Sequence, residues 1–214
     1  MSPDAPVAEQ PVSANRSVGR IVDADAHIDP PYEMWAEYLP APLRSLAPVI
    51  EEGEECDFVV FEGKRRPIRM INNQAGRAGK DFKMVGKRSE MRAAWLPDQR
   101  LADMDRDGID AAVLFGGGPL GTTNSELYIA SFETYNRWVW DFCSVNRHRL
   151  VPVAYLPMRD IDETLGLLRQ AARLGFRTAN IPAFPQASPR SAKNPMEAGR
   201  TAWYTQPFLL GERR

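Results

Sequence analysis

The sequence predicts a parallel α/β fold, arranged either as a doubly wound sheet or as a barrel. Short apolar strands alternate along the chain with segments of helical periodicity, which is the pattern of βαβ units. The 214 residues are 43% hydrophobic and 26% charged, so the chain can bury a core of ordinary globular type. Lys and Arg (27) nearly balance Asp and Glu (28), which argues against nucleic acid or a membrane surface as partner.

The first 19 residues predict a flexible leader. They contain three prolines, no aromatic residue and no apolar period, so they can bury little surface. No apolar run approaches the ~20 residues of a membrane span, and no secretory signal is present. Because Cys56 and Cys143 are too few for a disulfide framework, we expect reduced thiols and a cytoplasmic protein.

The first strand is predicted over Arg20–Ile28, because Pro30 and Pro31 can neither donate to a ladder nor continue one. A short helix follows over 32–39. From 51 to 97 the composition changes to charges and glycines, which indicates an insertion. Two short apolar runs within it, 57–61 and 68–71, predict a hairpin with the charged stretch between them as its connection.

The elements beyond the insertion alternate regularly between helix and strand. Gly108 and Gly175 stand where a left-handed residue would end a helix. The apolar periodicity predicts helices over 97–106, 125–145 and 160–174, and strands over 111–115, 150–157 and 176–181.

Acidic residues and a histidine alternate along the first predicted strand. Asp23, Asp25, His27 and Asp29 occupy every second position, which places them on one face of a regular strand. Asp is a poor strand former, and like charges on one face repel unless a cation lies between them. Asp25 and His27 could therefore ligate one divalent metal ion, although a surface histidine is an equally simple interpretation.

Three other motifs have simpler structural interpretations. The stretch 103–108 resembles the opening of a calcium loop, but Leu114 replaces the closing Glu, so a solvated helix end is preferred. The turn Gly116–Gly121 satisfies a dinucleotide-binding pattern, yet Pro119 removes a backbone donor that a pyrophosphate needs. Nucleotide binding stays a minority hypothesis. His148 lies in a polar turn before a strand and is interpreted as an exposed turn residue.

Taken together, four stretches resemble the amidohydrolase-related family, in the branch that includes aminocarboxymuconate-semialdehyde decarboxylase. They are VDADAHIDPP (22–31), RLADMDRDGIDAAVLF (100–115), YNRWVWDFCSVNRHRLVPVAYLP (135–157) and LGFRTANIPAFP (174–185). The tail WYTQPF (203–208) also looks like the family's approach to its fourth barrel helix. Their order and spacing carry the resemblance, which spans residues 20–208 and leaves 209–214 as a tail.

The resemblance implies a (β/α)8 barrel with a divalent metal, usually zinc, at the C-terminal mouth of the strands. Asp25 and His27 match the metal pair of the first strand, and Asp29 is a candidate to orient His27. The implied activity is hydrolysis or non-oxidative decarboxylation of a small organic substrate, carboxylated or cyclic.

The family's remaining ligands and proton donors come from later strands, whereas about four β/α units can be recognised here. We therefore expect the N-terminal part of such an enzyme, with its catalytic residues beyond residue 214 and little activity alone. The competing hypothesis is a non-catalytic half-barrel that serves as a binding or regulatory module, possibly as a homo-oligomer, since two open sheet edges would seek partners.

Overall fold

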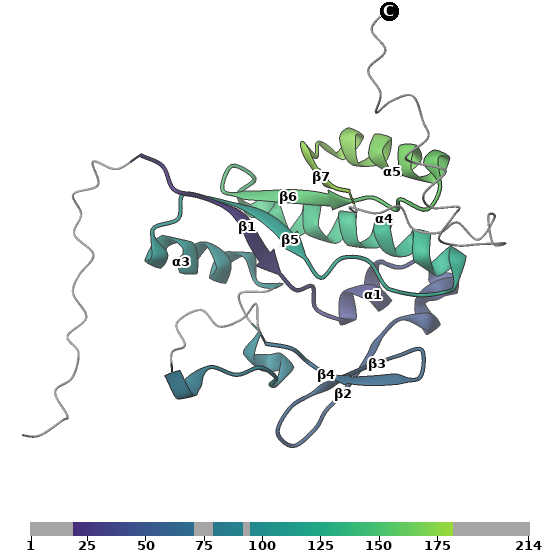
Figure 1. Ribbon diagram of the computed structural model, residues 1–214, viewed down its shortest axis with the longest axis horizontal. Helices are drawn as coiled ribbons and strands as arrows, with labels where there is room; N and C mark the ends of the chain where they lie inside the picture. Colours follow the sequence, from purple (N-terminus) through teal and green to yellow (C-terminus); the bar gives the residue numbers. More distant parts are fainter. Residues whose placement is uncertain (1–18, 71–78, 92–94, 182–214) are drawn as a thin grey trace, which may run out of the picture.

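A computed structural model describes residues 19–70, 79–91 and 95–181 (Figure 1). Its main sheet has four strands in the order β1-β5-β6-β7, and all three neighbouring pairs run parallel. These strands are β1 (Val22–Ile28), β5 (Ala111–Gly116), β6 (Leu150–Tyr155) and β7 (Thr178–Asn180). The predicted α/β class is confirmed, and each predicted strand is present with small shifts at its ends.

The order of the strands distinguishes a barrel from a doubly wound sheet. In a doubly wound sheet the order reverses at a switch point, whereas barrel strands follow one another around the axis. Here the strands lie in chain order, joined through α3 (Pro97–Asp107), α4 (Ser125–Phe142) and α5 (Ile161–Leu174). The arrangement is thus that of consecutive barrel units. Within the described residues the barrel is not closed, and β1 and β7 form the two edges of the sheet.

The core lies between the sheet and its helices. Alternate residues of β5 and of the C-terminal part of β1 point toward them, including Ala26, Ile28 and Leu114, all at most 3% exposed. α4 supplies Tyr135 and Val139, which are fully buried, and α1 (Glu33–Tyr38) packs against the same helix. The apolar periodicity that predicts this helix therefore corresponds to a face buried in the core.

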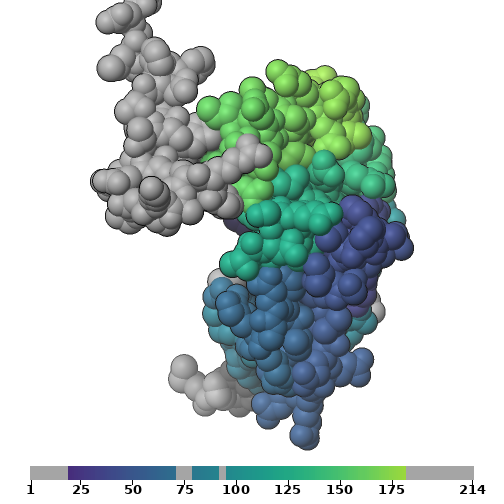
Figure 2. All heavy atoms as spheres, turned by 90° about the vertical axis from the view of Figure 1, so that its right-hand side faces the viewer, coloured from purple at the N-terminus to yellow at the C-terminus, as the bar shows by residue number. Residues whose placement is uncertain are grey.

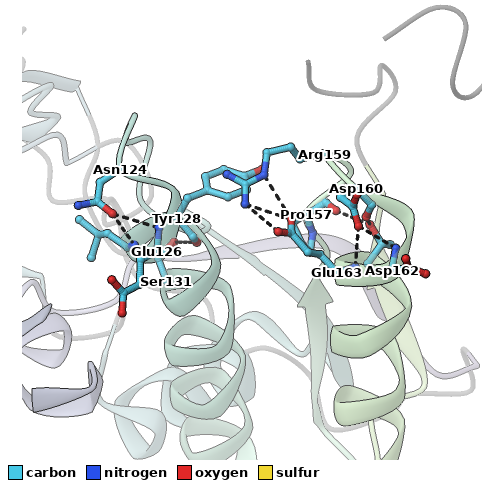
Figure 3. A network of polar contacts seen from close by, with 11 residues as sticks. Asn124, Glu126, Tyr128, Ser131, Pro157, Arg159, Asp160, Asp162 and Glu163 are labelled. Atoms are coloured by element: carbon cyan, nitrogen blue, oxygen red, sulfur yellow. Dashed lines mark hydrogen bonds and ion pairs between the residues drawn. The ribbon is translucent and has the colours of Figure 1, made fainter. Parts of the chain in front are cut away.

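The helices α4 and α5 begin with side-chain caps at the end of the sheet where β6 terminates (Figure 3). Asn124 accepts hydrogen bonds from two backbone amides of α4, and Asp160 does the same for α5. Between the two caps, Arg159 pairs with Glu163 and lies over the ring of Tyr128. These contacts fix the loops that follow β5 and β6, because each cap occupies orphan amides of a first turn.

The strand β1 contains one irregularity that the sequence did not indicate. Its register with β5 shifts between Asp23 and Ala26, and both Ala24 and Asp25 are exposed. Such a bulge inserts one residue and interrupts the alternation of side chains. The predicted common face is therefore wrong for Asp23, whose carboxylate instead accepts a hydrogen bond from the backbone N–H of Asp25 at 3.1 Å.

A second, antiparallel sheet is formed by residues inserted between β1 and α3. It contains β2 (Val49–Glu51), β3 (Phe58–Phe61) and β4 (Lys64–Pro67). The predicted hairpin is present, but the second strand is the charged stretch itself and not the apolar run that begins at Ile68. The turn is the pair Glu62-Gly63, both with positive φ, as a two-residue hairpin turn requires.

Among the described residues, three 3-10 helices interrupt this inserted region and the segment before it, and a fourth extends α4. They are η1 (Ala41–Leu46), η2 (Gly79–Asp81), η3 (Arg88–Glu90) and η4 (Cys143–Val145). Figure 2 shows the inserted residues, in blue, as a lobe beneath the residues of the main sheet. The lobe has a small core of its own, built from Ile68, Met70 and Met91.

The calcium-like stretch is the end of α3, as preferred from the sequence. Asp103 pairs with Arg106, and Asp105 pairs with Arg149 at 2.7 Å. Gly108 ends the helix with φ 70°, as predicted. The predicted leader, the tail and the segment WYTQPF lie outside the described residues.

Candidate functional site

Asp25 and His27 lie together on the open face of the main sheet, near the C-terminal end of β1. From Asp25 onward the strand alternates regularly, with Ala26 and Ile28 buried beneath the helices and Asp25 and His27 exposed on the other face. His27 stands opposite Phe115 of β5, and their ring centroids are 6.3 Å apart. The two predicted ligands thus share one face and one strand end.

Neither side chain has a hydrogen-bond or ion-pair partner among the described residues. A carboxylate and an imidazole held two residues apart on a strand are both good ligands for a divalent cation. No group of three histidine, cysteine or acidic side chains that could hold a metal occurs in the described part of the chain. The donor set present therefore fits two positions of a metal site.

The backbone of this strand end is held by Arg100 of α3. Its guanidinium donates to the carbonyl oxygen of His27 at 3.1 Å. Burial lowers the pKa of Arg100, and the nearby carboxylates of Asp23 and Asp103 oppose that shift. The bulge thus leaves a negative charge beside Arg100 while Asp25 and His27 face away from the helices.

Asp29 lies beyond the last residue of β1, at the edge of a cavity. It lines this cavity together with Tyr32 and Gly117. Burial raises the pKa of Tyr32, and the charge of Asp29 adds to that shift. The structure places Asp29 near the strand end that holds His27, and its role in orienting His27 stays a prediction.

The glycine-rich turn after β5 is explained by packing. A Cβ atom on Gly116 would lie 1.9 Å from the hydroxyl oxygen of Tyr135, and Gly118 has φ 74° beside the ring of Tyr155. The first free amides of α4 are already bonded to Asn124. Both observations weaken the dinucleotide hypothesis, since a pyrophosphate would need those amides.

The second histidine and the two cysteines lie away from this strand end. His148 is exposed in the turn before β6, at the N-terminal end of the strands, as predicted. Cys56 and Cys143 are both free thiols. Cys143 is fully buried under α4, and burial raises its pKa to about 12. An unreactive structural thiol is expected in such a position.

The basic side chains of the inserted hairpin also face a cavity, which the sequence pattern did not indicate. Lys64, Arg66 and Arg69 line the same cavity as Asp29. The available signal was the order Glu-Gly-Lys-Arg-Arg, in which glycine marks a hairpin turn and the cations then alternate along a strand. Because these residues are charged, the stretch was interpreted as the connection of the hairpin and not as one of its strands.

No family model matches the sequence, and a search of curated proteins finds no similar chain. Among solved structures, this chain is similar to an amidohydrolase from Mycobacterium avium subsp. paratuberculosis K-10. The TM-score is 0.53 at 15% identity, over 73% of this chain and 47% of that chain. This chain therefore spans about half the length of that amidohydrolase.

Two decarboxylases match more weakly. The similarity to 2,6-dihydroxybenzoate decarboxylase from Rhizobium has a TM-score of 0.44 at 17% identity and covers 79% of this chain and 40% of that one. A dihydroxybenzoic acid decarboxylase from Polaromonas sp. JS666, with bound manganese and the inhibitor 2-nitroresorcinol, gives a TM-score of 0.45 at 17% identity. That match covers 82% of this chain and 41% of the other.

The described residues have the fold of part of an amidohydrolase barrel. This conclusion rests on the first of these similarities and on the parallel strands lying in chain order. It confirms the resemblance inferred from the four sequence stretches at the level of the fold. Among the described residues, none of the helices has the length and apolar character of a membrane span.

Proposed function

We propose that this chain carries the first-strand part of a metal-dependent hydrolase or carboxy-lyase of the amidohydrolase type. Asp25 and His27 would hold one divalent metal ion, and zinc is the metal that the sequence resemblance implies. The observation that supports the proposal most is the shared exposed face of these two residues, near the C-terminal end of the first strand. In barrel enzymes the chemistry takes place at this end of the strands.

The protein's contribution at this position is to hold two ligands in place. Asp25 supplies a carboxylate oxygen and His27 an imidazole nitrogen, and Arg100 fixes the backbone carbonyl of His27. A divalent metal ion bound here would supply Lewis-acid activation of a water or a substrate oxygen. The substrate is a small organic molecule, and the choice between hydrolysis and decarboxylation rests with residues other than these two.

Metal content of the purified full-length chain tests this proposal. After dialysis against zinc or manganese, we expect bound metal in the wild-type chain and in His148→Ala. We expect a loss of at least tenfold in affinity in His27→Ala and in Asp25→Asn, because each removes one of the ligands present. His148→Ala is the matched control, since it removes the other histidine of the sequence.

Unchanged metal affinity in His27→Ala would contradict the assignment of this site. Circular dichroism of each variant shows whether the fold is intact, so that a loss of metal is attributed to the ligand and not to unfolding. Turnover of candidate carboxylic acids and amides by the metal-loaded chain then distinguishes a catalytic chain from a non-catalytic module.

A further inference from the structure

A cavity of about 490 Å³ lies between the inserted hairpin and the C-terminal ends of β1 and β5. Its volume falls in the range of small-molecule sites, about 300–1,000 Å³. One wall is formed by Asp29, Gly117 and Leu120, in the loops that follow β1 and β5, and the opposite wall comes from β3 and β4. A hydrogen bond from Thr122 to Glu62 joins the two walls.

The wall formed by β4 presents cations to this cavity. Lys64 and Arg66 are two residues apart on the strand and so lie on one face. Their directly opposite partners on β3, Phe61 and Val59, line the cavity too. Arg69 joins them from the residues that follow the strand. All three cationic side chains are exposed, and within the described ranges none of them forms an ion pair.

The neighbouring Arg65, on the same strand, differs from these three cations because it has partners. It lies on the other face of β4, pairs with Glu51 at 2.7 Å and lies over the ring of Phe58 at 3.2 Å. The hairpin thus separates a paired cation on its outer face from unpaired cations on its cavity face. Unpaired cations that line a concave surface are available to an anion.

The other residues around the cavity restrict the kinds of ligand that it can bind. Glu62 accepts from Thr122, and Asp29 lies on the opposite wall beside Tyr32. The side chains between the charged groups are largely apolar or aromatic. They include Tyr32, Pro48, Val59, Phe61, Met91 and Leu120. A bare inorganic anion would leave this surface uncovered.

We propose that this cavity binds a small organic anion, in which an oxyanion is attached to an apolar body. Lys64, Arg66 and Arg69 hold the oxyanion, and the body packs against Val59, Phe61 and Leu120. Binding by these cations is independent of the metal pair. The cavity begins next to the end of β1 that carries His27. That the bound anion is a substrate therefore rests on the proposed function.

Isothermal titration of the metal-free full chain tests the site directly. Benzoate serves as the probe, benzamide as its neutral analogue of similar shape, and inorganic phosphate as an oxyanion without an apolar body. We expect benzoate to bind at least tenfold more tightly than either of the other two, and to weaken as salt is added. Equal binding of benzamide would overturn the role of the cations, and equal binding of phosphate would overturn that of the apolar wall.

Charge-removing variants then locate the site. The double variant Arg66→Gln, Arg69→Gln should weaken benzoate binding at least tenfold, because two charge-assisted contacts are lost. Arg65→Gln, on the opposite face of the same strand, should change it less than twofold. Equal effects in the two variants, or no effect of the double substitution, would overturn the proposal, as would an absence of benzoate binding to the wild-type chain. Urea midpoints confirm that both variants fold.

The outcomes separate this proposal from that of the metal site. His27→Ala should leave benzoate binding to the metal-free chain unchanged. If the chain fails to bind metal while benzoate still depends on Arg66 and Arg69, only the proposed function is contradicted. If metal depends on His27 while benzoate does not bind, only the cavity proposal fails.

Discussion

At the scale of single residues, the alternation in the first strand carries the prediction of the site. Asp25 and His27 were predicted from their spacing, and the structure places both on the open face of the sheet. Asp23 follows the same spacing, but the bulge removes it from that set. A bulge leaves no sequence signature here, since no glycine marks it, so the failure at Asp23 could not be foreseen from pattern alone.

The contact between Gly116 and Tyr135 gives a stability prediction. Gly116→Ala should destabilise the chain by about 1–3 kcal/mol, because its Cβ would lie 1.9 Å from the buried hydroxyl oxygen of Tyr135. Gly121→Ala is the matched control, since its Cβ would meet nothing within 4 Å. Urea denaturation measures both, and equal midpoints for the two variants would refute this explanation.

Removing the Tyr135 hydroxyl should restore the stability of the Gly116→Ala variant. The Tyr135 oxygen is buried and has no hydrogen-bond partner among the described residues. Burying an unpaired hydroxyl is costly, so Tyr135→Phe alone should be neutral or stabilising. The double variant Gly116→Ala, Tyr135→Phe should recover most of the loss, because space is released where the new methyl group lies.

Burial of Cys143 predicts its thiol reactivity. Its pKa is raised from 9.0 to about 12, so the folded thiol stays protonated at pH 8–10, where an unfolded one ionises. The unfolded state therefore loses its proton first, and stability falls as pH rises from about 9 to about 12. A thiol reagent at pH 8 should modify Cys56 quickly and Cys143 only after urea is added. Rapid modification of both thiols in the folded chain would contradict this account.

At the scale of elements, the βα alternation was predictable and the inserted sheet was only partly so. The helices α3, α4 and α5 end or begin within a few residues of their predicted limits, because glycines and side-chain caps mark them. The strand β4 was missed because Lys64, Arg65 and Arg66 have low strand preference. Pairing with the apolar β3 overrides that preference. The cavity that β4 lines could therefore not be predicted either.

The buried side chain of Asn136 hydrogen-bonds α4 to β6. The side-chain amide of Asn136 donates to the carbonyl of Tyr155 at 3.0 Å, and its oxygen accepts from the backbone N–H of the same residue at 2.8 Å. Asn136→Ala should cost about 2–4 kcal/mol, since it leaves both backbone groups buried and unpaired. The exposed neighbour Arg137→Ala should change stability by less than about 0.5 kcal/mol. Thermal unfolding of both variants checks the difference.

At the scale of the whole molecule, the candidate site is distinguished from the other polar side chains by the end of the strands at which it lies. Asp25 and His27 lie near the C-terminal end of β1, and the cavity with its hairpin cations begins just beyond the ends of β1 and β5. His148 lies at the other end, before β6. In TIM-barrel enzymes generally, the C-terminal ends of the strands carry the chemistry and the N-terminal ends serve stability.

The two histidines lie at opposite ends of the strands, so a paramagnetic metal ion can show at which end it binds. Manganese at substoichiometric concentration should broaden the imidazole NMR signals of His27 and leave those of His148 sharp, because paramagnetic broadening falls steeply with distance. His27→Ala assigns the signals, and Asp25→Asn should abolish the broadening. Broadening of His148 alone, equal broadening of both histidines, or none at stoichiometric manganese would contradict a metal site on the first strand.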